Sequence, residues 1–298
     1  MDKNILQKLA ENSEKYMQFE TDRMITWCGM CGNFGVQNAL KRALTLENIS
    51  RNEVLFCYDI GCSGNGSDKI EGYTIHGLHG RVISLAAGAA IANSRIKVIA
   101  EAGDGATFSE GVNHLIHGVR NDYPIMFLHH NNQNYGLTTG QASACTIKGA
   151  KMNGAPYGVY EEPLNPLQIV LSLNPSFVAR CFSGDVPHMT SVFQEALKHK
   201  GFAFVEVLQS CPTYNKETPE DWYRERVKFI EDKKDYDVKN IWDARKIVDD
   251  QEKEIYIGVL YRNEERENFL KCVQGRKGLE TELVDEVERV VISPAERG

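Results

Sequence analysis

Polar residues with metal-binding chemistry follow two apolar segments of the chain. Residues 97–101 are rich in β-branched side chains and lead into a Gly-Asp-Gly turn at Asp104, and the apolar residues 124–129 precede an amide-rich loop. Such runs predict buried strands, and open α/β sheets bind ligands beyond the carboxyl ends of their strands. Magnesium prefers carboxylate, amide and carbonyl oxygens. Asp104, Asn132 and a backbone carbonyl, which we assign to Asn134, are therefore candidate Mg²⁺ ligands.

Cysteine spacing indicates a second kind of chemistry. Eight cysteines are more than packing needs, and in a reducing compartment they indicate metal or redox chemistry rather than disulfides. Cys28 and Cys31 form a CxxC pair, Cys62 lies in Gly-Cys-Ser, and Cys211 precedes a proline. Cysteine followed by proline is typical of iron–sulfur ligands, and four thiolates bind a [4Fe-4S] cluster.

Other roles remain open for these residues. A glycine turn and a polar loop are common between sheet elements, so either motif around Asp104 or Asn132 alone is consistent with a structural role. Structural zinc usually has two CxxC pairs, and only one is present. A thioredoxin-like redox pair would account for Cys28 and Cys31 but leave Cys62 without a role.

Composition narrows the class of protein. The chain has 298 residues, 42% of them hydrophobic, enough for one large core or a core with an appendage. It contains no run of 18 apolar residues, and its charged N-terminus lacks the apolar centre of a signal peptide, which predicts a cytoplasmic protein that does not enter membranes. A net charge of -7 argues against nucleic acid or anionic membrane as a partner.

Alternation of strands and helices predicts an α/β fold, with a parallel sheet covered by helices on both faces. The first expected helix begins near Asn33, a plausible N-cap. From residue 218 the composition becomes strongly charged, and residues 255–261 are one further strand-like run. We expect an N-terminal extension, a binding domain and a C-terminal arm that packs on the core or on a partner subunit: residues 1–24, 25–215 and 216–298. The expected strands are residues 51–58, 97–101, 124–129, 177–182 and 202–208, and the expected helices 33–46, 82–93, 108–120, 163–173 and 188–199.

Taken together, the motifs resemble the beta subunits of 2-oxoacid:ferredoxin oxidoreductases over roughly residues 25–213. Asn132 comes 28 residues after Asp104, within Asn-Asn-Gln-Asn-Tyr-Gly, which is similar to the thiamine diphosphate motif. The resemblance implies the diphosphate-binding domain of a thiamine diphosphate fold, with Mg²⁺ beside the cofactor. The family's W-C-x-x-C-G, G-C-S and C-P-T motifs imply one [4Fe-4S] cluster on Cys28, Cys31, Cys62 and Cys211.

The same resemblance implies which residues meet the cofactor. His79, the second histidine of Ile-His-Gly-Leu-His-Gly-Arg, corresponds to a residue that touches the diphosphate. A surface or packing role is equally open for His76, and His129 and His130 have no assigned role. The expected cofactor-binding residues are Ile60, Gly61, Cys62, Ser63, His79, Gly105, Ala106, Gly136 and Leu137.

The activity implied is coenzyme A-dependent oxidative decarboxylation of a 2-oxoacid, such as pyruvate or 2-oxoglutarate, with electrons passing through the cluster to ferredoxin. No residue here is assigned as the glutamate that activates the cofactor, so we expect an alpha-type partner subunit to supply it. One alternative is a non-redox thiamine diphosphate decarboxylase or lyase, which needs no cluster. Another is a non-catalytic iron–sulfur electron-transfer subunit, in which Asp104 and Asn132 are mere turn residues.

Several positions differ from what is common in that family. Ala106 stands where many relatives have a second acid, Asn131 where an aspartate is common, and residues 144–146 replace a frequent Ser-Pro-Thr. Asn65 is neutral where relatives often have a basic residue that meets the substrate carboxylate. Because no metal or cluster ligand is replaced, we expect the cofactors to bind and the substrate pocket to be unusual. Arg81 or a partner subunit would then meet the substrate carboxylate.

Overall fold

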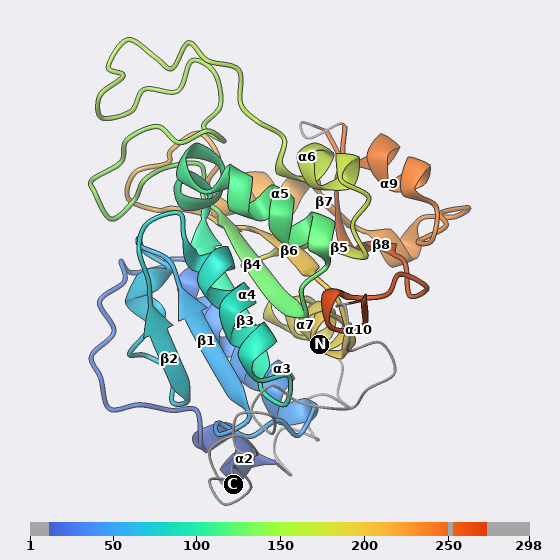
Figure 1. Cartoon of the computed structure of the whole chain (residues 1–298). Helices are drawn as coiled ribbons and strands as arrows, with labels where there is room; N and C mark the ends of the chain where they lie inside the picture. The colour runs from blue at the N-terminus through green and yellow to red at the C-terminus, as the bar shows by residue number, and fades with distance from the viewer. Residues whose placement is uncertain (1–11, 250–252, 273–298) are drawn as a thin grey trace, which may run out of the picture.

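An eight-stranded sheet with the order β2-β1-β3-β4-β6-β5-β8-β7 forms the centre of the protein (Figure 1). The computed structural model describes residues 12–249 and 253–272. The six strands from β2 to β5 run parallel, whereas β8 is antiparallel to β5 and parallel to β7. The strands are β1 Val54–Tyr58, β2 Tyr73–His76, β3 Lys97–Gly103, β4 Ile125–Asn131, β5 Phe177–Phe182, β6 Ala203–Leu208, β7 Val227–Phe229 and β8 Ile255–Arg262.

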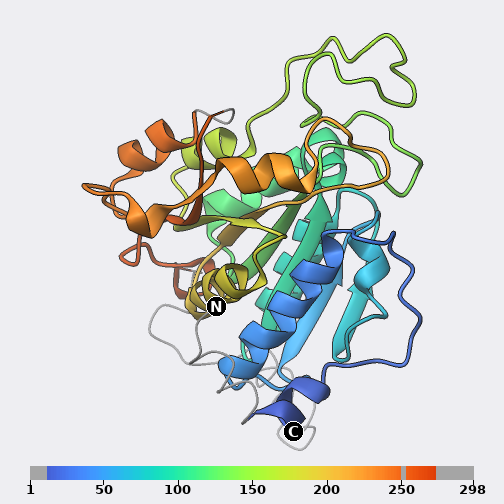
Figure 2. The same cartoon turned by 180° about the vertical axis from the view of Figure 1, so that it is seen from behind.

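Helices cover both faces of this sheet, as the sequence predicts. In α3, Val36, Leu40 and Leu44 recur at helical spacing and pack with α7 against one face, the face seen in Figure 2. The opposite face packs against α4, α5, α6 and α9. The helices are α2 Ser13–Met17, α3 Asn33–Leu46, α4 Val82–Ala92, α5 Val112–Asn121, α6 Pro166–Ser172, α7 Val186–Lys198, α8 Glu220–Arg226, α9 Ile241–Ile247 and α10 Phe269–Cys272.

Two local predictions about helices are wrong. Gly32 rather than Asn33 is the N-cap of α3, and Asn33 is the first helical residue, with its side chain buried. The single helix expected over residues 108–120 is divided, because a π-helical turn at Gly105–Glu110 precedes α5. That wide turn begins directly after Asp104, so the backbone next to the Gly-Asp-Gly motif is not an ordinary α-helix.

β2, the outermost strand on one side of the described sheet, is absent from the predicted strands, because it has only four residues and buries none of them. The region expected as a C-terminal arm contributes β8, which joins the same sheet through β5, so this part packs on the core. The boundaries near residues 24 and 215 remain predictions, and residues 1–11, 250–252 and 273–298 of the outer segments lie outside the described structure. In the described part, no helix is long and apolar enough to cross a membrane.

Candidate active site

A groove lies beyond the carboxyl ends of β1, β3 and β4, where the parallel sheet directs three neighbouring strands toward one edge. It encloses about 500 Å³ of empty space, part of it open to solvent. All nine residues expected to contact the cofactor line it, together with Asn132 and Asn134 of the expected metal site. The fold therefore brings these residues together, although their contacts with a ligand remain a prediction. The nine are Ile60, Gly61, Cys62, Ser63, His79, Gly105, Ala106, Gly136 and Leu137.

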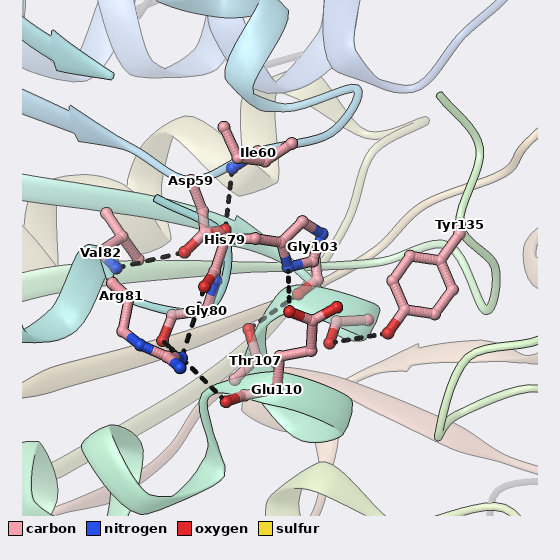
Figure 3. A network of polar contacts seen from close by, with 11 residues as sticks. Asp59, Ile60, His79, Gly80, Arg81, Val82, Gly103, Thr107, Glu110 and Tyr135 are labelled. Carbon is pink, nitrogen blue, oxygen red and sulfur yellow. Dashed lines mark hydrogen bonds and ion pairs between the residues drawn. The ribbon is translucent and has the colours of Figure 1, made fainter. Parts of the chain in front are cut away.

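A buried aspartate at the end of β1 joins two of the loops that form the groove (Figure 3). Oδ1 of Asp59 accepts hydrogen bonds from the backbone N–H of Ile60 at 2.8 Å and of Gly80 at 2.9 Å. Its Oδ2 accepts a third from the N–H of Val82 at 3.2 Å. Both carboxylate oxygens are thus occupied by backbone donors. Asp59 fixes the loop after β1 relative to the loop that carries His79.

The loop that carries His79 is held close to the π-helical turn. Nδ1 of His79 lies 3.1 Å from Glu110 Oε2, and Arg81 donates from Nη1 to the backbone carbonyl of Glu110 at 3.1 Å (Figure 3). Gly80 has φ +69°, and a Cβ there would lie 2.9 Å from the Glu110 backbone. Only glycine fits this conformation and this close approach. Arg81 therefore joins its own loop to the π-helical turn, and His79 faces the groove beside a carboxylate.

Asp104 lies at the end of β3 and is fully buried. Its Oδ2 accepts a hydrogen bond from Ser143 Oγ, whereas no donor among the described residues reaches its Oδ1. Burial raises the pKa of Asp104 to about 7, and the bond from Ser143 and the nearby backbone N–H groups of Asp104, Asn132 and Gly105 oppose this rise. An ionised carboxylate with one unpartnered oxygen is costly inside a protein. A cation at Oδ1 would remove that cost.

The amide loop after β4 is tied together by its own hydrogen bonds. Oδ1 of Asn132 accepts from the N–H of Asn134 at 3.1 Å, and Nδ2 of Asn134 donates to the carbonyl of Asn132 at 2.8 Å. Nδ2 of Asn215 donates to the same carbonyl at 3.1 Å, so the segment after Cys211 anchors this loop. The loop is thereby held beside Asp104, in keeping with a shared metal site.

The four motif cysteines gather at one side of the groove. A Cβ placed on Gly136 would lie 3.0 Å from Cys62 Sγ, and Cys211 Sγ is 3.9 Å from Asn134 Oδ1. Burial, and to a lesser extent the nearby thiols of Cys31, Cys211 and Cys28, raise the pKa of the Cys62 thiol to about 12. Trp27, next to Cys28, donates from Nε1 to the carbonyl of Cys62 at 2.7 Å. A cationic group bound at Cys62 would favour its thiolate form.

Family models match two consecutive parts of this chain. Residues 59–207 match the model described as thiamine pyrophosphate enzyme, C-terminal TPP binding domain. Residues 211–277 match the model for the C-terminal part of the pyruvate ferredoxin oxidoreductase beta subunit. The first region contains β3, β4 and the loops that follow β1, β3 and β4 into the groove, and the second begins at Cys211.

Proteins of similar sequence belong to the same family as the two matching models. The beta subunit of 2-oxoacid:ferredoxin oxidoreductase from Sulfolobus sp is 36% identical over 215 residues, 71% of this chain and 70% of that protein. The beta subunit of 2-oxoacid:ferredoxin oxidoreductase 2 from Aeropyrum pernix is 30% identical over 86% of both chains. This chain belongs to the beta subunits of the 2-oxoacid:ferredoxin oxidoreductases.

A solved structure in this family has the same fold. The 2-oxoglutarate:ferredoxin oxidoreductase from Magnetococcus marinus, solved with 2-oxoglutarate, coenzyme A and succinyl-CoA bound, aligns with a TM-score of 0.84 and 29% identity over 94% of this chain and 96% of that one. The predicted family, its enzymatic function and the thiamine diphosphate-binding domain are confirmed. The two alternative functions are set aside.

The residues fit the metal groups that the family implies. Among the described residues, no three His, Cys, Asp or Glu side chains converge closely enough to hold a single ion. A [4Fe-4S] cluster binds each thiolate through a different iron atom, so its ligands surround a larger volume. The expected Mg²⁺ site has only one carboxylate, Asp104, and takes its other ligands from the asparagine loop. The unpartnered oxygen of Asp104 and the clustered thiols are the observations that support this fit.

Sequence reasoning missed several residues of the site. His130, left without a role, lines the groove, with Nε2 3.0 Å from Glu101 Oε2 and Nδ1 2.9 Å from Gln209 Oε1. Asp59 is absent from the predicted site, although a carboxylate directly after a buried strand is a usable signal. No local pattern identified Gln209, because its partners lie far away in the sequence.

Proposed function

We propose that this chain binds the diphosphate end of thiamine diphosphate in the groove, with Mg²⁺ held by Asp104, the side chain of Asn132 and the backbone of Asn134. The observation that carries the proposal is Oδ1 of Asp104, a buried carboxylate oxygen without a donor beside a groove lined by the nine expected residues. Thiamine diphosphate supplies an electron sink for decarboxylation of 2-oxoacids. The chain supplies binding and orientation.

Each part of the groove has a role in holding an anionic cofactor. Asp59 keeps the loops of Ile60 and His79 at a fixed separation through three backbone hydrogen bonds. His79 lines the groove, with Nδ1 3.1 Å from Glu110 Oε2, and we assign its imidazole to a phosphate oxygen. These contacts preorganise the site before the cofactor enters.

We propose a single [4Fe-4S] cluster on Cys28, Cys31, Cys62 and Cys211. Cys62 lines the groove and shares a four-residue loop with Ile60 and Ser63, both expected cofactor contacts. This arrangement supports a short path for electrons from the cofactor to the cluster, and from there to ferredoxin. It gives a physical reason for one loop to carry both kinds of ligand.

We further propose that the chain works with an alpha-type subunit, which supplies the activating glutamate and part of the sites for coenzyme A and the 2-oxoacid. Two acids near the groove already have partners, because Glu101 meets His130 and Glu110 meets His79. The relatives are named as subunits, and the Magnetococcus enzyme was solved with 2-oxoglutarate and coenzyme A. Asn65 is neutral, so a basic residue from the partner would meet the substrate carboxylate.

Cysteine variants test the proposed ligation. Cys28→Ser, Cys62→Ser and Cys211→Ser, purified without oxygen, should each lose the visible absorption of the cluster, whereas wild type contains about four iron and four sulfide per chain. Cys272→Ser is the matched control, because Cys272 is exposed in α10 and no ligand role is proposed for it. Unchanged iron content in all three ligand variants would refute the assignment.

An activity assay tests the partner. The pure chain and the chain co-expressed with its genomic neighbour are compared for reduction of a viologen dye that depends on both a 2-oxoacid and coenzyme A. We expect turnover only in the complex. Full turnover by the isolated chain would contradict the shared active site.

A further inference from the structure

Gln209 connects the wall of the groove to one of the proposed cluster ligands. It follows β6 directly, and its side chain is 1% exposed. Its Oε1 lies 2.9 Å from Nδ1 of His130, while its Nε2 lies 3.0 Å from Asn33 Oδ1 and 3.8 Å from Cys31 Sγ. A side-chain amide has two N–H donors and a carbonyl acceptor. All of these groups therefore have a partner.

A ligating Cys31 thiolate favours the amide orientation seen in the structure, in which Nε2 of Gln209 faces the sulfur. In the reverse orientation, the carbonyl oxygen of Gln209 would face the Cys31 sulfur, and a thiolate has no hydrogen to donate. In this orientation Nδ1 of His130 donates to Gln209 Oε1. Nε2 of His130 lies 3.0 Å from Glu101 Oε2, and a second ring hydrogen there would hold the imidazole on both sides. The N–H of Gln209 is thus directed at Cys31 from a rigid neighbourhood.

The glycine after Cys31 makes room for this contact. A Cβ on Gly32 would lie only 2.5 Å from Cγ of Gln209 and 2.6 Å from Oγ of Ser183. Any side chain at position 32 would push Gln209 away from Cys31. The CxxC-Gly sequence therefore serves a packing need as well as a ligation pattern.

We propose that Gln209 is a positioning residue that holds Cys31 toward the [4Fe-4S] cluster and, by donating an N–H to its sulfur, raises the reduction potential of that cluster. The inference rests on the proposed function, because it takes Cys31 as a ligand. Reduction adds negative charge that the thiolate sulfurs share, and a hydrogen bond to sulfur stabilises that charge. Because His130 lines the groove and orients Gln209, the cofactor site and the cluster ligand share one packed unit.

The test compares Gln209→Leu with Gln194→Leu in the full chain, purified without oxygen. Gln194 is a matched control on α7, where its Nε2 donates to Glu47 Oε1 at 2.6 Å and touches no proposed ligand. Reductive titration gives the midpoint potential, and electron paramagnetic resonance of the reduced cluster reports its environment. We expect Gln209→Leu to retain the cluster with a lower potential and an altered spectrum, while Gln194→Leu matches wild type.

A second variant covers loss of folding. Gln209→Glu has nearly the same shape but removes the donor and adds negative charge, so it should lower the potential further or lose the cluster. Circular dichroism establishes which variants fold. If Gln209→Leu does not fold, the potential and spectrum of Gln209→Glu provide the test. An unchanged potential and spectrum in a folded variant would overturn the role of Gln209. Absence of iron from wild type would instead refute the proposed cluster ligation, and this inference with it.

Discussion

Asp59 and Asp104 are both fully buried and lie at the carboxyl ends of neighbouring strands, but their environments differ. Three backbone N–H groups occupy both oxygens of Asp59, whereas Asp104 has one oxygen bonded to Ser143 and the other without a donor among the described residues. Burial without compensating donors is a cost to folding. Burial of a carboxylate therefore does not by itself identify a binding site. Asp59 uses both oxygens to hold two loops together, whereas Asp104 retains an oxygen that can bind a ligand.

Replacing Asp104 should have the largest effect on cofactor binding. Asp104→Asn removes the charge that meets Mg²⁺, and we expect cofactor affinity in the presence of Mg²⁺ to fall roughly 100-fold, about 3 kcal/mol. Calorimetric titration with thiamine diphosphate measures this loss. The melting temperature should not fall, because the variant removes a poorly compensated buried charge. Normal affinity in Asp104→Asn would mean that this carboxylate is not a metal ligand.

The pH dependence of folding should report the same carboxylate in the metal-free chain. A pKa of about 7 in the folded state, against 3.8 as the ordinary value, means that the folded chain binds more protons between these values. Protonation of Asp104 therefore contributes on the order of 4 kcal/mol to the free energy of unfolding. This contribution is fully present below about pH 4 and is lost as the pH rises through 7. Urea unfolding with a chelator at pH 5 to 8 measures it. Asp104→Asn should flatten this part of the profile; the same slope in the variant would assign the effect to another group.

Replacing Asp59 should chiefly reduce stability. In Asp59→Asn one oxygen becomes an NH₂ group facing backbone donors, so we expect the free energy of unfolding to fall by about 2–4 kcal/mol. Urea unfolding measures the change, with Asp104→Asn as the matched control. The folded Asp59→Asn protein should still bind thiamine diphosphate in a Mg²⁺-dependent manner, when the cofactor concentration is high enough to stabilise the fold. A variant as stable as wild type would remove the distinction between the two aspartates.

Glu110 should have the smallest effect. Its carboxylate is 46% exposed and lies 3.1 Å from Nδ1 of His79, and exposed ion pairs contribute little. Glu110→Gln should weaken cofactor binding by about two- to fivefold, or roughly 0.4–1 kcal/mol. Titration at low and high salt tests the charge contribution, which should shrink at high salt. His79→Gln is the comparison and should lose more, since His79 itself lines the groove.

Sequence could predict the elements whose pattern is local. Residues 177–182 form β5 with the expected bounds, because an apolar run between turn residues leaves few alternatives. The position of the groove could also be predicted from the sequence. Its residues follow neighbouring parallel strands, and the carboxyl ends of parallel strands lie at the same edge of a sheet. In contrast, the strand β2 has only four residues, all exposed, and the antiparallel pairing of β8 with β5 joins segments far apart in the chain.

Interactions between distant residues were the least predictable part of the site. Gln209 is 79 residues from His130 and 178 from Cys31, and nothing near any of the three indicates that they meet. Tertiary packing alone creates this contact. The π-helical turn was hidden for a related reason: its residues match a helical pattern, and its greater width depends on how β3 and α5 are joined.

The π-helical turn at Gly105–Glu110 makes this stretch intolerant of changes in length. It lies between Asp104 and α5, whose Leu115 and Val119 pack in the core. Each residue of an α-helix turns the next by about 100°. Deleting one residue here would either turn Leu115 and Val119 away from the core or displace Asp104 from the groove. Across evolution, this part of the chain should therefore vary by substitution rather than by insertion or deletion.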